Sequence, residues 1–229
     1  MGNNINDGYA DSNRFSDKAL LIYNDFLHSG KFLTHYKWLK NAAEDYDIKL
    51  ELMGNSECLC SYGTSFDNEL IETLGKYRFI LFWDKDIRLG KKFTNICKKI
   101  NIPIYNNIRA IADCDDKSAT YEKIGQWNDC HDTLEQIKMI PTIVAPMTYE
   151  NIGYTDMNFL DKVAEKFGFP LVIKECFGSF GMQVYMAHDM DELKKRVSDI
   201  GGKPMIFQKF IEKSSGFDVR LQVVGDEVV

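Results

Sequence analysis

The 229-residue chain lacks any apolar run long enough to cross a bilayer, and it does not start with a charged stretch followed by an apolar core. A transmembrane helix needs about 20 consecutive apolar residues, and a secretory leader needs that two-part start, so a membrane partner is not expected. The chain also lacks excess positive charge, because 34 acidic residues outnumber 28 basic ones. Nonspecific nucleic-acid binding requires a basic face, so it is not expected either, although a local basic pocket remains compatible with the composition.

The cysteines and histidines lack the spacing of a metal site. None of the 6 cysteines belongs to a pair of C-x-x-C motifs, the arrangement found in zinc ribbons. Cys58 and Cys60 could hold a metal together, but without a second pair they are better interpreted as small reduced side chains. The 4 histidines form no H-E-x-x-H motif. No metal ligand is therefore assigned, and a reduced cytoplasmic location is expected.

The first half of the chain alternates apolar strands with amphipathic helices. The predicted strands are residues 19–23, 48–53, 79–83 and 103–105, and the predicted helices are 31–45 and 91–100. The third strand is apolar throughout, as is typical of a strand covered by helices on both faces. Lys91, Lys92, Lys98 and Lys99 are expected on the exposed face of the second helix. Residues 17–112 therefore predict an α/β domain with a largely parallel sheet, preceded by a flexible tail at 1–16.

A polar break after Ala112 marks a predicted domain boundary and opens another helix. The helices expected beyond it are 155–167 and 191–200; the extended segments are 140–146, 171–174, 182–187, 204–207, 218–224 and 227–229. Gly225-Asp226 between the last two is a two-residue hairpin signal. The returning strand has only three residues up to Val229, so we expect the sheet to be incomplete there.

A lysine at the end of a predicted buried strand precedes a glycine-containing loop. Lys174 ends the strand, and the loop carries Gly178, Ser179, Phe180 and Gly181. Glycine lets the backbone approach a phosphate closely, and successive N–H groups can form an anion-binding nest. Taken singly, the lysine could be a surface residue that ends its strand, and the loop a simple hairpin connection. The pattern is neither a P-loop nor a G-x-G-x-x-G fingerprint.

Two further patterns carry candidate ligand-binding residues. Residues 208–211, Gln-Lys-Phe-Ile, mix polar and apolar side chains at a strand end, and Asp218 follows a polar loop. Asp218 offers two acceptor oxygens that suit vicinal hydroxyl groups. Lys117 follows Asp116 at the start of a predicted helix, where it could be either a solvated side chain or a phosphate ligand.

In this order the motifs resemble the ATP-grasp superfamily, most closely its RimK-like amino-acid ligases, over about residues 113–229. The resemblance implies that the lysines and the glycine loop bind phosphate, that residues 208–211 bind adenine, and that Asp218 binds ribose. Arg220 matches the arginine of the family's Asp-x-Arg strand, which makes it the candidate catalytic residue, through structural pairing or contact with a charged substrate. The implied nucleotide-binding residues are Lys117, Lys174, Gly178, Ser179, Phe180, Gly181, Gln208, Lys209, Phe210, Ile211 and Asp218.

The fold class implied is α/β: a pre-ATP-grasp α/β domain at 17–112, followed by an incomplete ATP-grasp (α+β) domain at 113–229. That second domain would comprise a lid subdomain and the first strands of the second subdomain. The strands that carry the magnesium ligands in this family would follow Val229, so no ligand for Mg²⁺ can be named and catalysis by this chain alone is not expected.

The resemblance also implies an activity. An ATP-dependent, ADP-forming ligase would activate a carboxylate as an acylphosphate and join it to the amine of an amino acid or peptide. A homo-oligomer is a further expectation. The alternative is a noncatalytic nucleotide-binding module or one piece of a split ligase.

Overall fold

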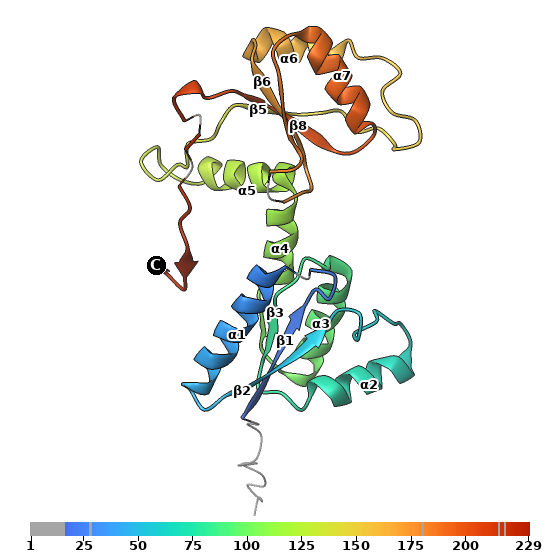
Figure 1. Cartoon of the computed structure of the whole chain (residues 1–229), viewed down its shortest axis with the longest axis vertical. Coiled ribbons are helices and arrows are strands. Elements are labelled where there is room, and N and C mark those ends of the chain that lie inside the picture. The colour runs from blue at the N-terminus through green and yellow to red at the C-terminus, as the bar shows by residue number, and fades with distance from the viewer. Residues whose placement is uncertain (1–16, 28, 180, 215, 218) are drawn as a thin grey trace, which may run out of the picture. The chain divides into compact units, whose positions relative to one another are not determined.

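The computed structural model describes residues 17–27, 29–179, 181–214, 216–217 and 219–229. The chain divides into two compact units, Met1–Ala112 and Asp113–Val229, shown in Figure 1. Helix α4 (Ile108–Asp115) crosses this boundary along the chain. The two units are described separately.

Unit 1 is built around a parallel four-stranded sheet. Its strands are β1 (Lys18–Tyr23), β2 (Lys49–Gly54), β3 (Ile80–Phe82) and β4 (Ile104–Tyr105). They lie in the order β2-β1-β3-β4, and every pairing is parallel. The predicted parallel sheet is therefore confirmed, with each predicted strand within a few residues of the observed one.

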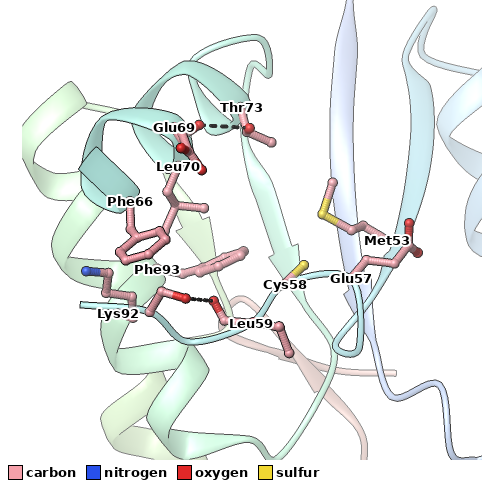
Figure 2. Close-up of a pocket in the computed structure, with 11 residues that line it drawn as sticks. Met53, Glu57, Cys58, Leu59, Phe66, Glu69, Leu70, Thr73, Lys92 and Phe93 are labelled. Carbon is pink, nitrogen blue, oxygen red and sulfur yellow. Dashed lines mark hydrogen bonds between the residues drawn. The ribbon is translucent and has the colours of Figure 1, made fainter. Parts of the chain in front are cut away.

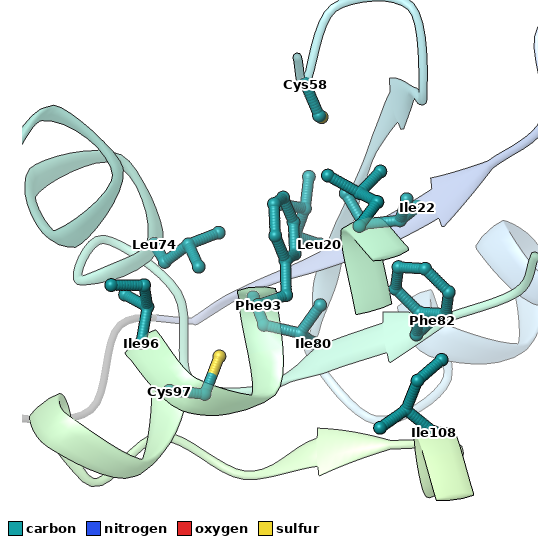
Figure 3. Close-up of a cluster of buried hydrophobic side chains, with 11 residues drawn as sticks. Leu20, Ile22, Cys58, Leu74, Ile80, Phe82, Phe93, Ile96, Cys97 and Ile108 are labelled. Atoms are coloured by element: carbon teal, nitrogen blue, oxygen red, sulfur yellow. The ribbon is translucent and has the colours of Figure 1, made fainter. Parts of the chain in front are cut away.

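Helices cover both faces of this sheet, as the apolar strands predicted. They are α1 (Gly30–Glu44), α2 (Thr64–Leu74) and α3 (Ile87–Ile100). Side chains alternate along β1: Leu20 and Ile22 join the cluster that contains Leu74 of α2 and Phe93 of α3, part of which is drawn in Figure 3. Ala19 and Leu21 instead pack in the cluster on the α1 side.

Two predictions about unit 1 need correction. Helix α2 was not predicted, and α3 begins at Ile87 rather than Lys91 because the Asp86 carboxylate caps it by accepting a hydrogen bond from Leu89 N at 3.0 Å. The expectation that Lys92 is exposed is wrong, since only 8% of the residue is accessible. Its ammonium group is paired with Asp67 of the unpredicted helix.

Unit 2 contains an antiparallel sheet of four strands in the order β5-β8-β6-β7. The strands are β5 (Thr142–Val144), β6 (Leu171–Glu175), β7 (Val184–Ala187) and β8 (Met205–Lys209). The helices are α5 (Lys117–Asp129), α6 (Phe159–Phe167) and α7 (Met190–Ile200). The predicted helix at 155–167 therefore starts four residues later, at Phe159.

The two faces of this sheet have different environments. Leu171, Ile173 and Phe207 pack on one face against α6 and α7, which lie together on one side of the sheet in Figure 1, with α5 on the other. Residues paired directly across strands share a face, so the registers define an opposite surface, here called the α5 face. It consists of Thr142, Val144, Val172, Lys174, Val184, Met186, Ile206 and Gln208.

The last part of unit 2 is a short 3-10 turn at Glu212–Ser214 and a hairpin of β9 (Val223–Val224) and β10 (Glu227–Val228). The predicted hairpin turn is confirmed, with Gly225 at φ +64°. The predicted strand 218–224 is too long, because regular pairing starts at Val223. Among the described residues, no helix combines the length and apolar character needed to cross a bilayer.

Candidate functional site

Two lysines from distant parts of unit 2 are held at the end of β6. Lys117 begins α5, and its backbone N–H donates to the carbonyl of Cys176 at 3.0 Å. Its Nζ donates to the same oxygen at 3.3 Å. Lys174 lies two residues earlier on β6. The Cys176 carbonyl therefore ties the start of the helix to the strand that carries the second lysine.

The electrostatics of this pair favour an anionic ligand. Partial burial, and then the charge of Lys117, lowers the pKa of Lys174 below its ordinary value. Among the described residues, neither lysine forms an ion pair with a carboxylate. A half-buried ammonium beside a like charge is costly unless an opposite charge compensates it. A phosphate group would supply that compensation.

The start of α5 is fixed by its own cap. The Asp116 carboxylate accepts hydrogen bonds from Ser118 N at 2.8 Å and Ser118 Oγ at 2.6 Å. Asp116 is a favoured residue type at this position because its carboxylate satisfies N–H groups that have no helical partner. The cap fixes where α5 begins and hence where Lys117 leaves the backbone.

The loop between β6 and β7 has backbone geometry that requires glycine. Gly178 has φ +147° and Gly181 has φ +72°, in the region that L side chains rarely adopt. A Cβ at Gly178 would also lie 2.4 Å from Gln183 Oε1. The Ser179 carbonyl accepts from Met182 N at 3.4 Å, and the predicted Phe180 lies outside the described residues. The loop that follows Lys174 along the chain therefore depends on glycine for its backbone conformation.

The predicted adenine segment begins in β8, an inner strand of the same sheet, and continues past its end. Gln208 is 2% exposed and lies on the α5 face, whereas Lys209 is exposed and Phe210 half-buried. The chain then turns at Ile211, whose carbonyl accepts from Ser214 N at 3.1 Å. Gln208 and Lys174 share one face on neighbouring strands, so the predicted base and phosphate ligands belong to one surface.

Sequence reasoning missed two residues of this surface. Gln208 Nε2 donates to the hydroxyl oxygens of Tyr121, at 2.5 Å, and Thr142, at 2.9 Å. Tyr121 lies four positions after Lys117 on α5, a spacing that places both on one helix face. This spacing could have identified Tyr121 from the sequence. Thr142 could be recognised only once the register of β5 against β8 was known.

The remaining predicted residues are not joined to this surface by any described contact. Asp218 lies outside the described residues. Arg220 is exposed, and it belongs to no helix or strand. Their roles in ribose binding and catalysis stay predictions.

Unit 1 contains a separate pocket of about 310 Å³. Figure 2 shows aromatic and aliphatic side chains around it, with Lys92 at one side. The lining residues are Met53, Glu57, Cys58, Leu59, Ser61, Phe66, Glu69, Leu70, Thr73, Lys92 and Phe93. Lys92 is paired with Asp67, and its Nζ lies 4.9 Å from the centre of the Tyr62 ring. Its charge is neutralised inside the protein, in contrast to the lysines of unit 2.

Within the part of the chain that the structure describes, no three side chains of histidine, cysteine, aspartate or glutamate converge to form a metal site. No ligand for Mg²⁺ is therefore assigned among these residues.

The sequence is similar to a known family model and to known proteins. Residues 130–229 match the RimK-like ATP-grasp domain. Over 215 residues the chain is 28% identical to the uncharacterized protein MG012 homolog of Mycoplasma pneumoniae, covering 91% of this chain and 67% of that protein. It is also 28% identical over 200 residues to the coenzyme gamma-F420-2:alpha-L-glutamate ligase of Methanocaldococcus jannaschii, covering 83% of this chain and 62% of that protein.

The fold has solved counterparts. The N5-carboxyaminoimidazole synthetase of Staphylococcus aureus, solved in complex with ADP, superposes with a TM-score of 0.59 at 16% identity. The match covers 86% of this chain and 48% of that protein, so the chain spans about half the length of this structural relative. The alternating first unit, the antiparallel second unit and the matched domain agree with one another. Residues 130–229 are therefore similar to the RimK-like ATP-grasp domain, and the fold of the chain is similar to that of a synthetase solved in complex with ADP.

Proposed function

We propose that this chain provides the ATP-binding part of an ADP-forming carboxylate–amine ligase. The observation that carries the proposal is the pair Lys117 and Lys174. Lys117 donates to the Cys176 carbonyl at the end of β6, its charge lowers the pKa of Lys174, and neither lysine has a carboxylate partner among the described residues. Two adjacent cations beside a glycine loop suit the phosphates of a nucleoside triphosphate.

The proposed reaction has two steps. A carboxylate oxygen of the donor attacks the γ-phosphorus of ATP, the bond to the β–γ bridging oxygen breaks, and ADP leaves. The amine of the acceptor then attacks the acyl carbon of the acylphosphate. The carbon–oxygen bond breaks, inorganic phosphate leaves, and the amine loses a proton as the amide forms.

The lysines act on charge in the first step. The carboxylate and the triphosphate are both anionic, so their approach in a poorly hydrated site is opposed by several kcal/mol unless cations intervene. Lys117 and Lys174 would neutralise part of the phosphate charge as it redistributes toward ADP. The loop at 178–181 would add backbone and Ser179 hydroxyl donors.

The base and sugar would bind next to this cluster. The adenine would contact the four residues Gln208, Lys209, Phe210 and Ile211. The Asp218 carboxylate would accept hydrogen bonds from the ribose hydroxyl groups. Arg220 would contact a charged substrate group or pair structurally. These assignments rest on the motif order, supported by the placement of Gln208 and Lys174 on one face.

The other parts of the proposal rest on the family. The substrates would be an amino acid or a peptide, in keeping with the glutamate ligase among the relatives. The protein would act in the cytoplasm, as a homo-oligomer, and with Mg²⁺. No ligand for Mg²⁺ is assigned among the described residues, and no step above is routed through the metal.

The test traces an oxygen atom from the donor carboxylate to the released inorganic phosphate. A chain that contains the complete ATP-grasp domain is incubated with ATP, Mg²⁺ and mixtures of ¹⁸O-carboxylate-labelled donors and amino-acid acceptors, and the released phosphate is analysed by mass spectrometry. An acylphosphate route transfers one ¹⁸O from the carboxylate to phosphate, and the Lys117→Met/Lys174→Met double variant should abolish the transfer. The 229 residues alone are expected to bind ATP without transfer, and ATP binding without transfer by the complete domain would favour the noncatalytic module. Absence of ATP binding would overturn the proposal.

A further inference from the structure

We propose that Thr142 is a positioning residue that fixes the side-chain amide of Gln208, so that Gln208 Oε1 faces the base and selects nucleotides with an exocyclic amino group. This inference rests on the proposed ATP site and adds a determinant of base selectivity to it. It is carried by the hydrogen bonds around a nearly fully buried glutamine.

The geometry places the two side chains opposite each other. Thr142 of β5 pairs directly with Gln208 of β8, on the α5 face. Thr142 Oγ1 lies 2.9 Å from Gln208 Nε2 and 2.8 Å from the carbonyl oxygen of Ile140.

The protons of this network can be assigned. A carbonyl oxygen only accepts, so the single hydroxyl proton of Thr142 is donated to Ile140 O. Thr142 Oγ1 can therefore only accept from Gln208, and the glutamine atom facing it must be the nitrogen. This assignment does not depend on which end of the amide was labelled nitrogen, an ambiguity that usually affects glutamine side chains.

The second amide proton is also used. Gln208 Nε2 donates to Tyr121 Oη at 2.5 Å. Turning the amide by 180° would replace two donors with an oxygen that Thr142 cannot donate to. The network therefore holds one orientation of the amide, with Oε1 directed away from both hydroxyl groups.

Gln208 Oε1 is left as an available acceptor. No hydrogen bond to it occurs within the described residues. The enclosed side-chain atoms without a partner in that part of the chain are Thr94 Oγ1 and Gln183 Oε1. Gln208 Oε1 is not one of them, so this oxygen is not fully enclosed although only 2% of Gln208 is exposed. An adenine amino group could donate to it, whereas the carbonyl of hypoxanthine would meet a second acceptor. A mismatch of this kind at a poorly hydrated position is costly.

The experiment compares ATP with inosine triphosphate (ITP), in which a carbonyl replaces the amino group. Dissociation constants are measured by calorimetry for the wild type, Thr142→Val and Thr142→Ser. We expect the wild type to prefer ATP by about tenfold or more, or about 1.4 kcal/mol. Thr142→Val should reduce this preference to below about threefold, and Thr142→Ser, which keeps the hydroxyl, should retain it. Thr73→Val removes a hydroxyl bonded to a backbone carbonyl in unit 1 and should change nothing.

The outcomes separate the two proposals. Selective ATP binding with an unchanged ATP:ITP ratio in Thr142→Val would overturn this inference and leave the proposed function standing. Absence of ATP binding by the wild type would overturn both. If Thr142→Val does not fold, NMR of the wild type tests whether the Gln208 amide is fixed. Both Gln208 Nε2 protons should then exchange with solvent much more slowly than the side-chain amide protons of the exposed Gln222. Equally fast exchange would refute the fixed amide.

Discussion

Replacing Lys174 by methionine should have opposite effects on ligand binding and on stability. The side chain is half-buried, has no carboxylate partner among the described residues, and lies close enough to Lys117 for the charge of Lys117 to lower its pKa. Methionine keeps much of the length and apolar stem while removing the charge. We therefore expect the variant to bind ATP less tightly without becoming less stable.

The magnitude follows from the charge that is lost. An ammonium and a phosphate 4 Å apart attract by about 4 kcal/mol at an effective dielectric constant of about 20. Solvent screening of a half-exposed side chain reduces this to about 1–3 kcal/mol, so the dissociation constant for ATP should rise by about tenfold to a hundredfold. Adenosine has no phosphate, and its affinity should stay within about threefold.

Calorimetry with ATP and adenosine measures the first effect, and urea unfolding without ligand measures the second. The free energy of unfolding should stay equal or rise, because burial and Lys117 both oppose the charge of Lys174 in the folded state. Lys195→Met is the matched control, since that lysine forms an exposed pair with Asp199 on α7, and neither ligand should be affected. Equal losses for ATP and adenosine, or a clear loss of stability, would refute the assignment of Lys174 to phosphate binding.

Three further predictions concern the same units. Gly178→Ala should lower the free energy of unfolding by about 1–3 kcal/mol and weaken ATP binding. The reason is that the new Cβ would contact the Gln183 side chain and that φ is +147° at this position. Urea unfolding and calorimetry measure the two effects, and unchanged values would contradict the loop geometry. Burial raises the pKa of Cys97 to about 11, so iodoacetamide at pH 8 should label the exposed Cys114 well before Cys97, as read by mass spectrometry, and equal labelling would count against the buried position. The lowered pKa of Lys174 in the folded state means that its charge destabilises the folded protein below that pKa. This penalty is relieved as the pH rises from the lowered value toward the ordinary lysine pKa of about 10.4. Urea unfolding between about pH 7 and 10.5 should therefore show the wild type gaining stability relative to Lys174→Met, and parallel curves would exclude the shift.

The architecture could be predicted where local pattern is sufficient. Residues 79–83 are apolar at every position and form a central strand of a parallel sheet, as expected for a strand covered on both faces. Helix α2 was missed although Phe66, Leu70 and Leu74 follow helical spacing, because the polar residues between them obscure a short apolar stripe. The burial of Lys92 could not be foreseen without that helix, since Asp67 on α2 neutralises its charge.

The candidate site shows where sequence reasoning stops. Lys117 and Lys174 could be named from the order of motifs, but the bond from Lys117 to the Cys176 carbonyl depends on how α5 packs near the end of β6. Thr142 and Gln208 are 66 positions apart, and a register shift of one residue would place them on opposite faces. Contacts of that kind are set by the folded sheet and leave no periodic trace in the sequence.

The two faces of the unit 2 sheet are unequally covered, and this has a thermodynamic consequence. On the α5 face, Val144, Val184 and Met186 remain 53%, 42% and 37% exposed, whereas the opposite face is buried under α6 and α7. A bound purine would cover these side chains and so act as a removable part of the hydrophobic core. Bound ATP would raise the free energy of unfolding by RT ln(1 + [ATP]/Kd). The cellular ATP concentration would then set how long β5 and β7 stay closed to hydrogen exchange and proteases, so that the lifetime of the domain would follow the energy state of the cell.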